Sequence, residues 1–132
     1  MNKCPILFFS LLGILSFSAC QASENDLKTK KPNYSATYLK CTDEAVNPNH
    51  CIEQELKVQD TKLNIAYHEA RKSIQPFRVD ALKEMQRAWI KYRDKKCGFF
   101  QHKQSGSSGV TDALQCTLDE TIHRTKELEN LY

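Results

Sequence analysis

The chain is short and only weakly basic, which limits it to one small domain. It has 132 residues, six cysteines and a formal net charge of +3. About 95 residues follow the export signal and linker described next, enough for a single domain with a modest hydrophobic core. The export signal also argues against a nucleic-acid partner, which basic proteins meet in the cytoplasm.

Residues 1–19 predict an export signal. The basic start Met1–Lys3 precedes the apolar run Pro5–Leu15, which is too short for a resident membrane helix of about 20 residues. The four residues Phe17–Cys20 resemble a bacterial lipobox, although phenylalanine replaces the usual leucine at its first position. We therefore expect a lipid anchor on Cys20 and a place in the bacterial cell envelope. Ordinary cleavage after Ala22 is the alternative, and it would give a soluble periplasmic or secreted protein.

Residues 20–36 are expected to form the anchor and a flexible linker, and residues 37–132 the folded domain. The stretch from Asn25 to Ala36 is polar, carries three lysines and Pro32, and lacks helical periodicity.

Four cysteines remain for the domain once Cys4 and Cys20 are assigned to the signal and the anchor. An even number in an exported chain predicts two disulfides, for which three connectivities are possible. We prefer Cys41–Cys51 with Cys97–Cys116, because each pair would bracket one local junction between helices. A zinc site is the competing use, but the chain has no C-x-x-C pair and export disfavours it. We expect no metal and no other cofactor.

Hydrophobic spacing predicts an all-α fold, a three-helix bundle with a short helix or turn near residues 42–46 before it. The first helix is expected to start at Asn47-Pro48, an N-cap followed by proline, and to end before Pro76. The second is expected from about Asp80 to residue 97 or 100. A polar loop over residues 101–109 follows, and Thr111 or Asp112 should begin the third helix.

The second helix carries two contrasting faces. One is an apolar stripe that we expect in the core, and its members are Leu82, Met85, Trp89 and Tyr92. The other is a basic ridge at successive i+4 steps, formed by Lys83, Arg87, Lys91 and Lys95. Like charges at this spacing cost a few tenths of a kcal/mol per pair. The ridge is either a solvated face or a binding face for anionic lipid or glycan.

No catalytic motif is complete in the sequence. His68-Glu69 lacks the second histidine that a zinc-protease helix requires four residues after the first. The Ser105–Gly109 stretch resembles a nucleophile elbow only superficially, because no strand precedes it. We therefore expect a protein that is not an enzyme.

One set of polar and aromatic residues resembles a known family. These residues are Asp60, Asn64, Tyr67, Gln86, Trp89, Arg93 and Arg124, spaced around Cys51, Cys97 and Cys116. The pattern resembles the LprI-type lysozyme-inhibitor family, many of whose members are uncharacterised lipoproteins. The resemblance implies a small helical, disulfide-stapled envelope domain and, less directly, inhibition of lysozyme. Independently of the family, Trp89 would anchor the core, and Asp60 and Arg93 could form an ion pair between helices.

Three functions follow from these observations. The first is binding and inhibition of a lysozyme-like glycoside hydrolase, with a polar loop occluding its cleft. The candidate contact residues of that loop are Gln101, His102, Lys103 and Ser105. The alternatives are a non-inhibitory envelope module that binds anionic lipid or glycan through the basic ridge, and an immunity protein against a wall-degrading toxin. Because animal lysozymes are strongly basic, we expect the loop and the acidic third helix to face such a partner.

Overall fold

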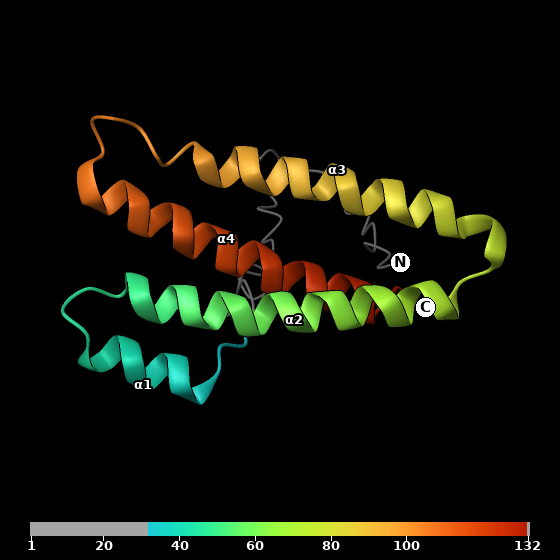
Figure 1. Ribbon diagram of the computed structural model, residues 1–132, viewed down its shortest axis with the longest axis horizontal. Helices are drawn as coiled ribbons and strands as arrows, with labels where there is room; N and C mark the ends of the chain where they lie inside the picture. Colours follow the sequence, from blue (N-terminus) through green and yellow to red (C-terminus); the bar gives the residue numbers. More distant parts are fainter. Residues whose placement is uncertain (1–31, 132) are drawn as a thin grey trace, which may run out of the picture. The chain divides into compact units, whose positions relative to one another are not determined.

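The computed structural model describes residues 32–131, and these form an all-α domain (Figure 1). The helices are α1 (Ala36–Glu44), α2 (Asn49–Ser73), α3 (Val79–Gly98) and α4 (Gly106–Glu129), with the short 3-10 helix η1 (Pro76–Arg78) between α2 and α3. The predicted fold class is confirmed.

Helix α4 is the central element of this bundle. It packs against both α2 and α3, while α1 packs against α2 (Figure 1). The connection between α3 and α4 lies at the end of the bundle where α2 begins, and η1 lies at the opposite end. Residues at the two ends of α3 are therefore presented at opposite ends of the domain.

Two helix starts differ from the predictions. Helix α1 begins at Ala36 rather than near residue 42, because the Ser35 hydroxyl accepts a hydrogen bond from the Tyr38 N–H at 3.1 Å and caps it. Helix α4 begins at Gly106, five residues before Thr111. Glycine and serine form helices poorly, and packing of this first turn beneath the preceding loop overrides their low propensity.

The other boundaries fall close to the predicted positions. Helix α2 begins at Asn49, with Pro48 in the N-cap position, one residue later than predicted. The side chain of Asn47 still accepts a hydrogen bond from the Asn49 N–H at 3.0 Å. Helix α2 ends at Ser73, just ahead of Pro76, which begins η1. Helix α3 ends at Gly98, within the predicted range.

The core consists of two hydrophobic clusters. The cluster near η1 contains Leu63, Ala66, Ala70, Ile74, Leu82 and Leu128. The cluster near α1 contains Tyr38, Cys51, Ile52, Leu118 and Ile122. Buried polar side chains supplement these clusters, namely Glu55, Gln59, Gln86, Thr121, Arg124 and Thr125. A domain of this size therefore depends on hydrogen bonds inside it as well as on apolar packing.

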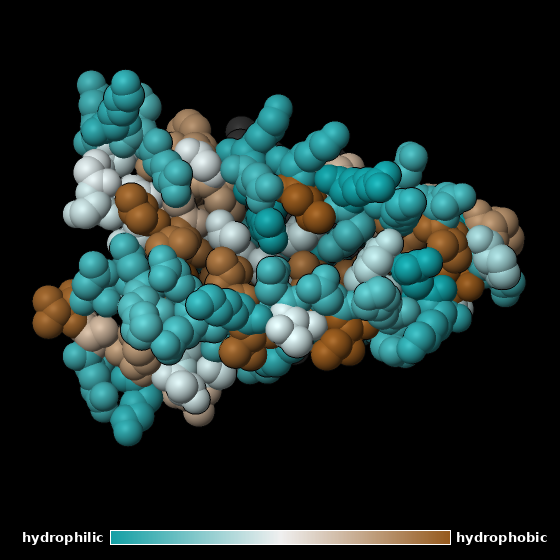
Figure 2. All heavy atoms as spheres, viewed as in Figure 1, coloured by the Kyte–Doolittle hydropathy of each residue, from teal (hydrophilic) through white to brown (hydrophobic). Residues whose placement is uncertain are grey.

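The apolar stripe predicted for α3 is only partly buried. Leu82 is in the core, but Met85 and Tyr92 are exposed, at 39% and 55%, and Trp89 is half-buried. The prediction of a four-residue core stripe is therefore wrong for Met85 and Tyr92. The physical reason is that α3 packs mainly against α4, so only a narrow strip of its surface leaves the solvent. Hydrophilic side chains consequently cover much of the face shown in Figure 2.

Both predicted disulfides are present. Cys41 is bonded to Cys51 and joins α1 to the start of α2, and Cys97 is bonded to Cys116 and joins the end of α3 to α4. Each bond thus holds two consecutive helices together across their connection.

The export signal, the lipidation site Cys20 and most of the predicted linker lie outside the described residues, and they stay predictions. Tyr34 and Ser35, although inside the predicted linker, contact α4 and α2. No helix within residues 32–131 is long and apolar enough to cross a membrane.

Candidate binding surfaces

A groove between α2 and α3 gathers most of the family-like residues. It has a volume of about 410 Å³. Its lining is Asp60, Leu63, Asn64 and Tyr67 from α2, and Lys83, Gln86, Arg87, Trp89, Ile90 and Arg93 from α3. Six of the seven residues that carry the family resemblance line this groove, so the fold brings a dispersed sequence pattern into one place.

The seventh residue, Arg124 of α4, contacts the groove lining from the buried side. Its Nε donates to Oε1 of Gln86 at 2.9 Å, and its guanidinium lies 5.7 Å from the centre of the Trp89 ring. Its Nη1 donates to Glu127 at 2.9 Å. Its Nη2 is buried and has no hydrogen-bond partner within residues 32–131. An unpaired buried N–H of a charged group costs free energy.

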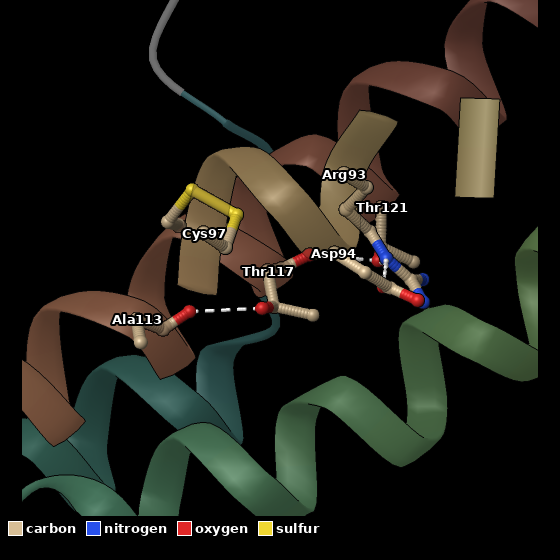
Figure 3. Close-up of polar contacts among 7 residues, drawn as sticks. Arg93, Asp94, Cys97, Ala113, Thr117 and Thr121 are labelled. Carbon is tan, nitrogen blue, oxygen red and sulfur yellow. Dashed lines mark hydrogen bonds and ion pairs between the residues drawn. A yellow bond between two sulfur atoms is a disulfide. The ribbon is translucent and has the colours of Figure 1, made fainter. Parts of the chain in front are cut away.

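Arg93 does not pair with Asp60, contrary to the expected ion pair between helices. It bonds Asp94 on its own helix at 2.9 Å, and its Nη1 reaches the Thr121 hydroxyl of α4 at 3.5 Å (Figure 3). Its guanidinium also lies 5.0 Å from the centre of the Trp89 ring. The arginine therefore turns toward α4, and the Asp60 carboxylate forms no ion pair within the described part of the chain.

The structure divides the basic ridge into two halves. Lys83 and Arg87 line the groove, whereas Lys91 and Lys95 lie beyond it, and all four are exposed. The ridge is therefore two pairs of cations in different surroundings rather than one uniform surface.

A second candidate surface is the tip, which we define as Phe99–Ser105 between α3 and α4. All seven residues are exposed, including the predicted contact residues Gln101, His102, Lys103 and Ser105. Phe99 is 82% exposed and Phe100 39% exposed, with their ring centres 5.9 Å apart. The tip is shorter than the predicted loop, because residues 106–109 belong to α4.

Gly109 fixes the position of the tip over the start of α4. A Cβ atom at this residue would lie 2.5 Å from the carbonyl oxygen of Phe100 and 2.6 Å from the Cβ of Ser105. Only glycine permits the loop backbone to approach the helix so closely. Together with the Cys97–Cys116 bond, this contact restrains both ends of the tip.

The sequence interpretation missed Phe99 and Phe100. The available signal was a pair of aromatic residues directly after Gly98, where the helix pattern ends and the polar loop begins. Apolar periodicity places these two residues at the end of the second predicted helix, and it gives no indication that they are exposed.

It also missed a polar network that joins the segment before α1 to the bundle. The Tyr34 hydroxyl donates to Asp119 at 2.6 Å, and Ser35 donates to Glu55 through its N–H and its hydroxyl at 2.9 and 2.6 Å. Burial and the hydrogen bond to Asp119 raise the pKa of Tyr34 well above its ordinary value, so its phenol stays a donor. Burial alone would raise the pKa of Glu55, but the hydrogen bonds from Ser35 and Gln59 outweigh it and lower that pKa.

Within residues 32–131, no group of three or more histidine, cysteine, aspartate or glutamate side chains is arranged to hold a metal ion. The features available for binding at the groove and the tip are therefore hydrogen-bonding groups, charges and aromatic rings.

The family described as "Lysozyme inhibitor LprI" matches residues 40–128, a span that includes the groove, the tip and both disulfides. The chain belongs to the LprI family. This membership agrees with the resemblance carried by the groove residues.

Among curated proteins, the LprI-family chain is similar to the "Uncharacterized protein YecT" of Escherichia coli (strain K12). The two are 29% identical over 141 aligned residues, covering 89% of this chain and 85% of the relative. No solved structure matches the chain.

Proposed function

We propose that this chain is an exported protein that inhibits a lysozyme-like muramidase by inserting its tip into the enzyme's cleft. Family membership supports the activity, and the exposed aromatic pair of the tip carries the choice of surface. Two disulfides fit a protein that works in an oxidising compartment such as the bacterial envelope.

The chemistry of the tip suits such a cleft. Muramidases of the lysozyme type carry two catalytic carboxyl groups that flank the scissile bond. Lys103 and His102 can offer a cation and hydrogen-bond donors to such carboxyl groups. Phe99 would supply the apolar contact, because exposed aromatic residues become the energetic centres of many interfaces.

Helix α4 offers less free negative charge to a basic enzyme than its sequence indicates. Asp119 accepts a hydrogen bond from Tyr34, Glu120 pairs with Lys96 at 2.6 Å, and Glu127 pairs with Arg124. Asp112 is exposed beside the tip, where it shares a hollow with Phe99 and Phe100. The contact with a basic lysozyme would therefore centre on the tip and Asp112.

The test is a muramidase assay with the purified full chain and two matched variants. Phe99→Ala should weaken inhibition roughly 30-fold, the loss of about 2 kcal/mol expected of an interface hot spot. Phe77→Ala should leave inhibition unchanged, since Phe77 is equally exposed, at 78%, but lies in η1 at the other end of the bundle.

Three outcomes decide the proposal. Absence of inhibition at roughly 50 µM, with every muramidase tried, would remove the function, because a complex with micromolar Kd would be saturated there. Inhibition that Phe77→Ala weakens as much as Phe99→Ala would remove the tip as the contact. Inhibition of one bacterial wall-cutting toxin, with lysozymes unaffected, would identify an immunity protein instead.

A further inference from the structure

The lining of the groove between α2 and α3 includes hydrogen-bond donors that have no partner among the described residues. Arg124 contacts Gln86 from the buried side and does not itself line the groove. The side-chain carbonyl oxygen of Gln86 accepts a hydrogen bond from Arg124, and its Nε2 makes no hydrogen bond to any described residue. Lys83 and Arg87 add two cations to the rim of the groove. A ligand bound here would therefore need a negatively charged group with several acceptor positions.

The same groove also offers acceptors and aromatic rings. The Asp60 carboxylate and the Asn64 amide line its α2 side, and both are exposed. A carboxylate would repel a ligand that is anionic throughout, but it accepts hydrogen bonds from hydroxyl groups. Tyr67 and Trp89 supply half-buried rings between the two polar sides. The volume of about 410 Å³ is within the range of small-molecule sites, roughly 300–1,000 Å³.

We infer that the groove binds an acidic saccharide, with its carboxylate held by Gln86 and Arg87 and its hydroxyl groups bonded to Asp60 and Asn64. Planar amide and guanidinium donors match the planar carboxylate group better than an ammonium does. This site shares no residue with the tip, so it does not depend on muramidase inhibition.

Trp89 makes binding directly measurable. It is the only tryptophan of the chain and lines the groove, so its fluorescence should change when a ligand enters. The probe is digalacturonic acid, titrated into the purified full chain, with its dimethyl ester as the uncharged control. We expect saturable binding of the acid at millimolar or lower concentration, and binding at least roughly tenfold weaker for the ester, which lacks the charge.

The divided basic ridge supplies matched variants. The double variant Lys83→Gln with Arg87→Gln should weaken binding at least roughly tenfold, since both cations line the groove. The double variant Lys91→Gln with Lys95→Gln removes the same charge from the same helix outside the groove. It should change the affinity by no more than about twofold, the effect of distant, screened charge. All four side chains are exposed, so circular dichroism should show that both variants fold.

Each remaining outcome overturns the inference. If both double variants lose binding equally, the ligand is attracted by the overall positive charge of the ridge and is not bound in the groove. If the acid does not bind at about 10 mM, or the ester binds as well, the groove does not recognise a carboxylate. If glucose 1-phosphate binds more tightly than digalacturonic acid, the ligand class is a phosphate.

Discussion

At the scale of single residues, buried charge decides how the domain responds to acid. Glu55 is 3% exposed, and its carboxylate accepts hydrogen bonds from Ser35 and from Gln59, the latter at 2.7 Å. Its pKa in the folded protein is below the ordinary value of 4.5. A carboxylate with a lowered pKa contributes stability above its unfolded pKa, and this contribution is lost as the pH falls through the folded pKa.

When the pH drops under about 4.5, we therefore expect the free energy of unfolding to decrease, partly because Glu55 becomes protonated. The variant Glu55→Gln should be less stable than the wild type at pH 7, and the two should converge toward pH 3. Urea denaturation at several pH values measures both curves. A constant difference between them across this range would show that Glu55 does not contribute to the acid response.

Trp89 and Met85 test how deeply α3 is buried. Trp89→Ala should cost about 2–3 kcal/mol, less than the roughly 3–5 expected of a fully buried tryptophan, because its side chain is only half-buried. Met85→Ala should cost less than about 0.5 kcal/mol, since the side chain is exposed. Denaturant unfolding gives both values. Equal losses would mean that α3 packs as the sequence stripe predicted.

At the scale of elements, the junction between α3 and α4 depends on close backbone contact. Gly109→Ala should destabilise the domain by about 1–3 kcal/mol, because its Cβ would collide with the Phe100 carbonyl and move the tip. Gly98→Ala, where no atom lies within 4 Å of the added Cβ, should be neutral or slightly stabilising. Thermal unfolding and the muramidase assay together measure both effects. If Gly109→Ala weakens inhibition without loss of stability, inhibition depends on the position of the tip and not on the stability of the domain.

The elements also show which structural features are readable from sequence. Asn47-Pro48 and Pro76 set the ends of α2 through local backbone chemistry, so they could be predicted. The start of α4 could not, since it depends on Gly109 fitting beneath a carbonyl of another segment. The pairing of Cys97 with Cys116 was predictable because both partners flank one short connection.

At the scale of the whole molecule, periodicity indicates which faces are apolar but not which helix will cover them. Met85 and Tyr92 satisfied the helical pattern, yet α4 covers too little of α3 to bury them. The same limit hid the groove. The spacing of Asp60, Asn64 and Trp89 in the sequence indicates a structural role for them. It does not show that they line one open groove, because that depends on the tertiary packing of α2, α3 and α4.

The unequal packing of the helices has a consequence for native-state amide hydrogen exchange. Helix α4 buries eight residues and α3 buries three, one of which is the disulfide-bonded Cys97. Helices with few buried contacts open in low-energy local fluctuations, ahead of global unfolding. The amides of α3 between Val79 and Arg93 should exchange faster than those in the middle of α4, which nuclear magnetic resonance or mass spectrometry can follow. Equal protection of the two helices would show that the bundle opens as one unit.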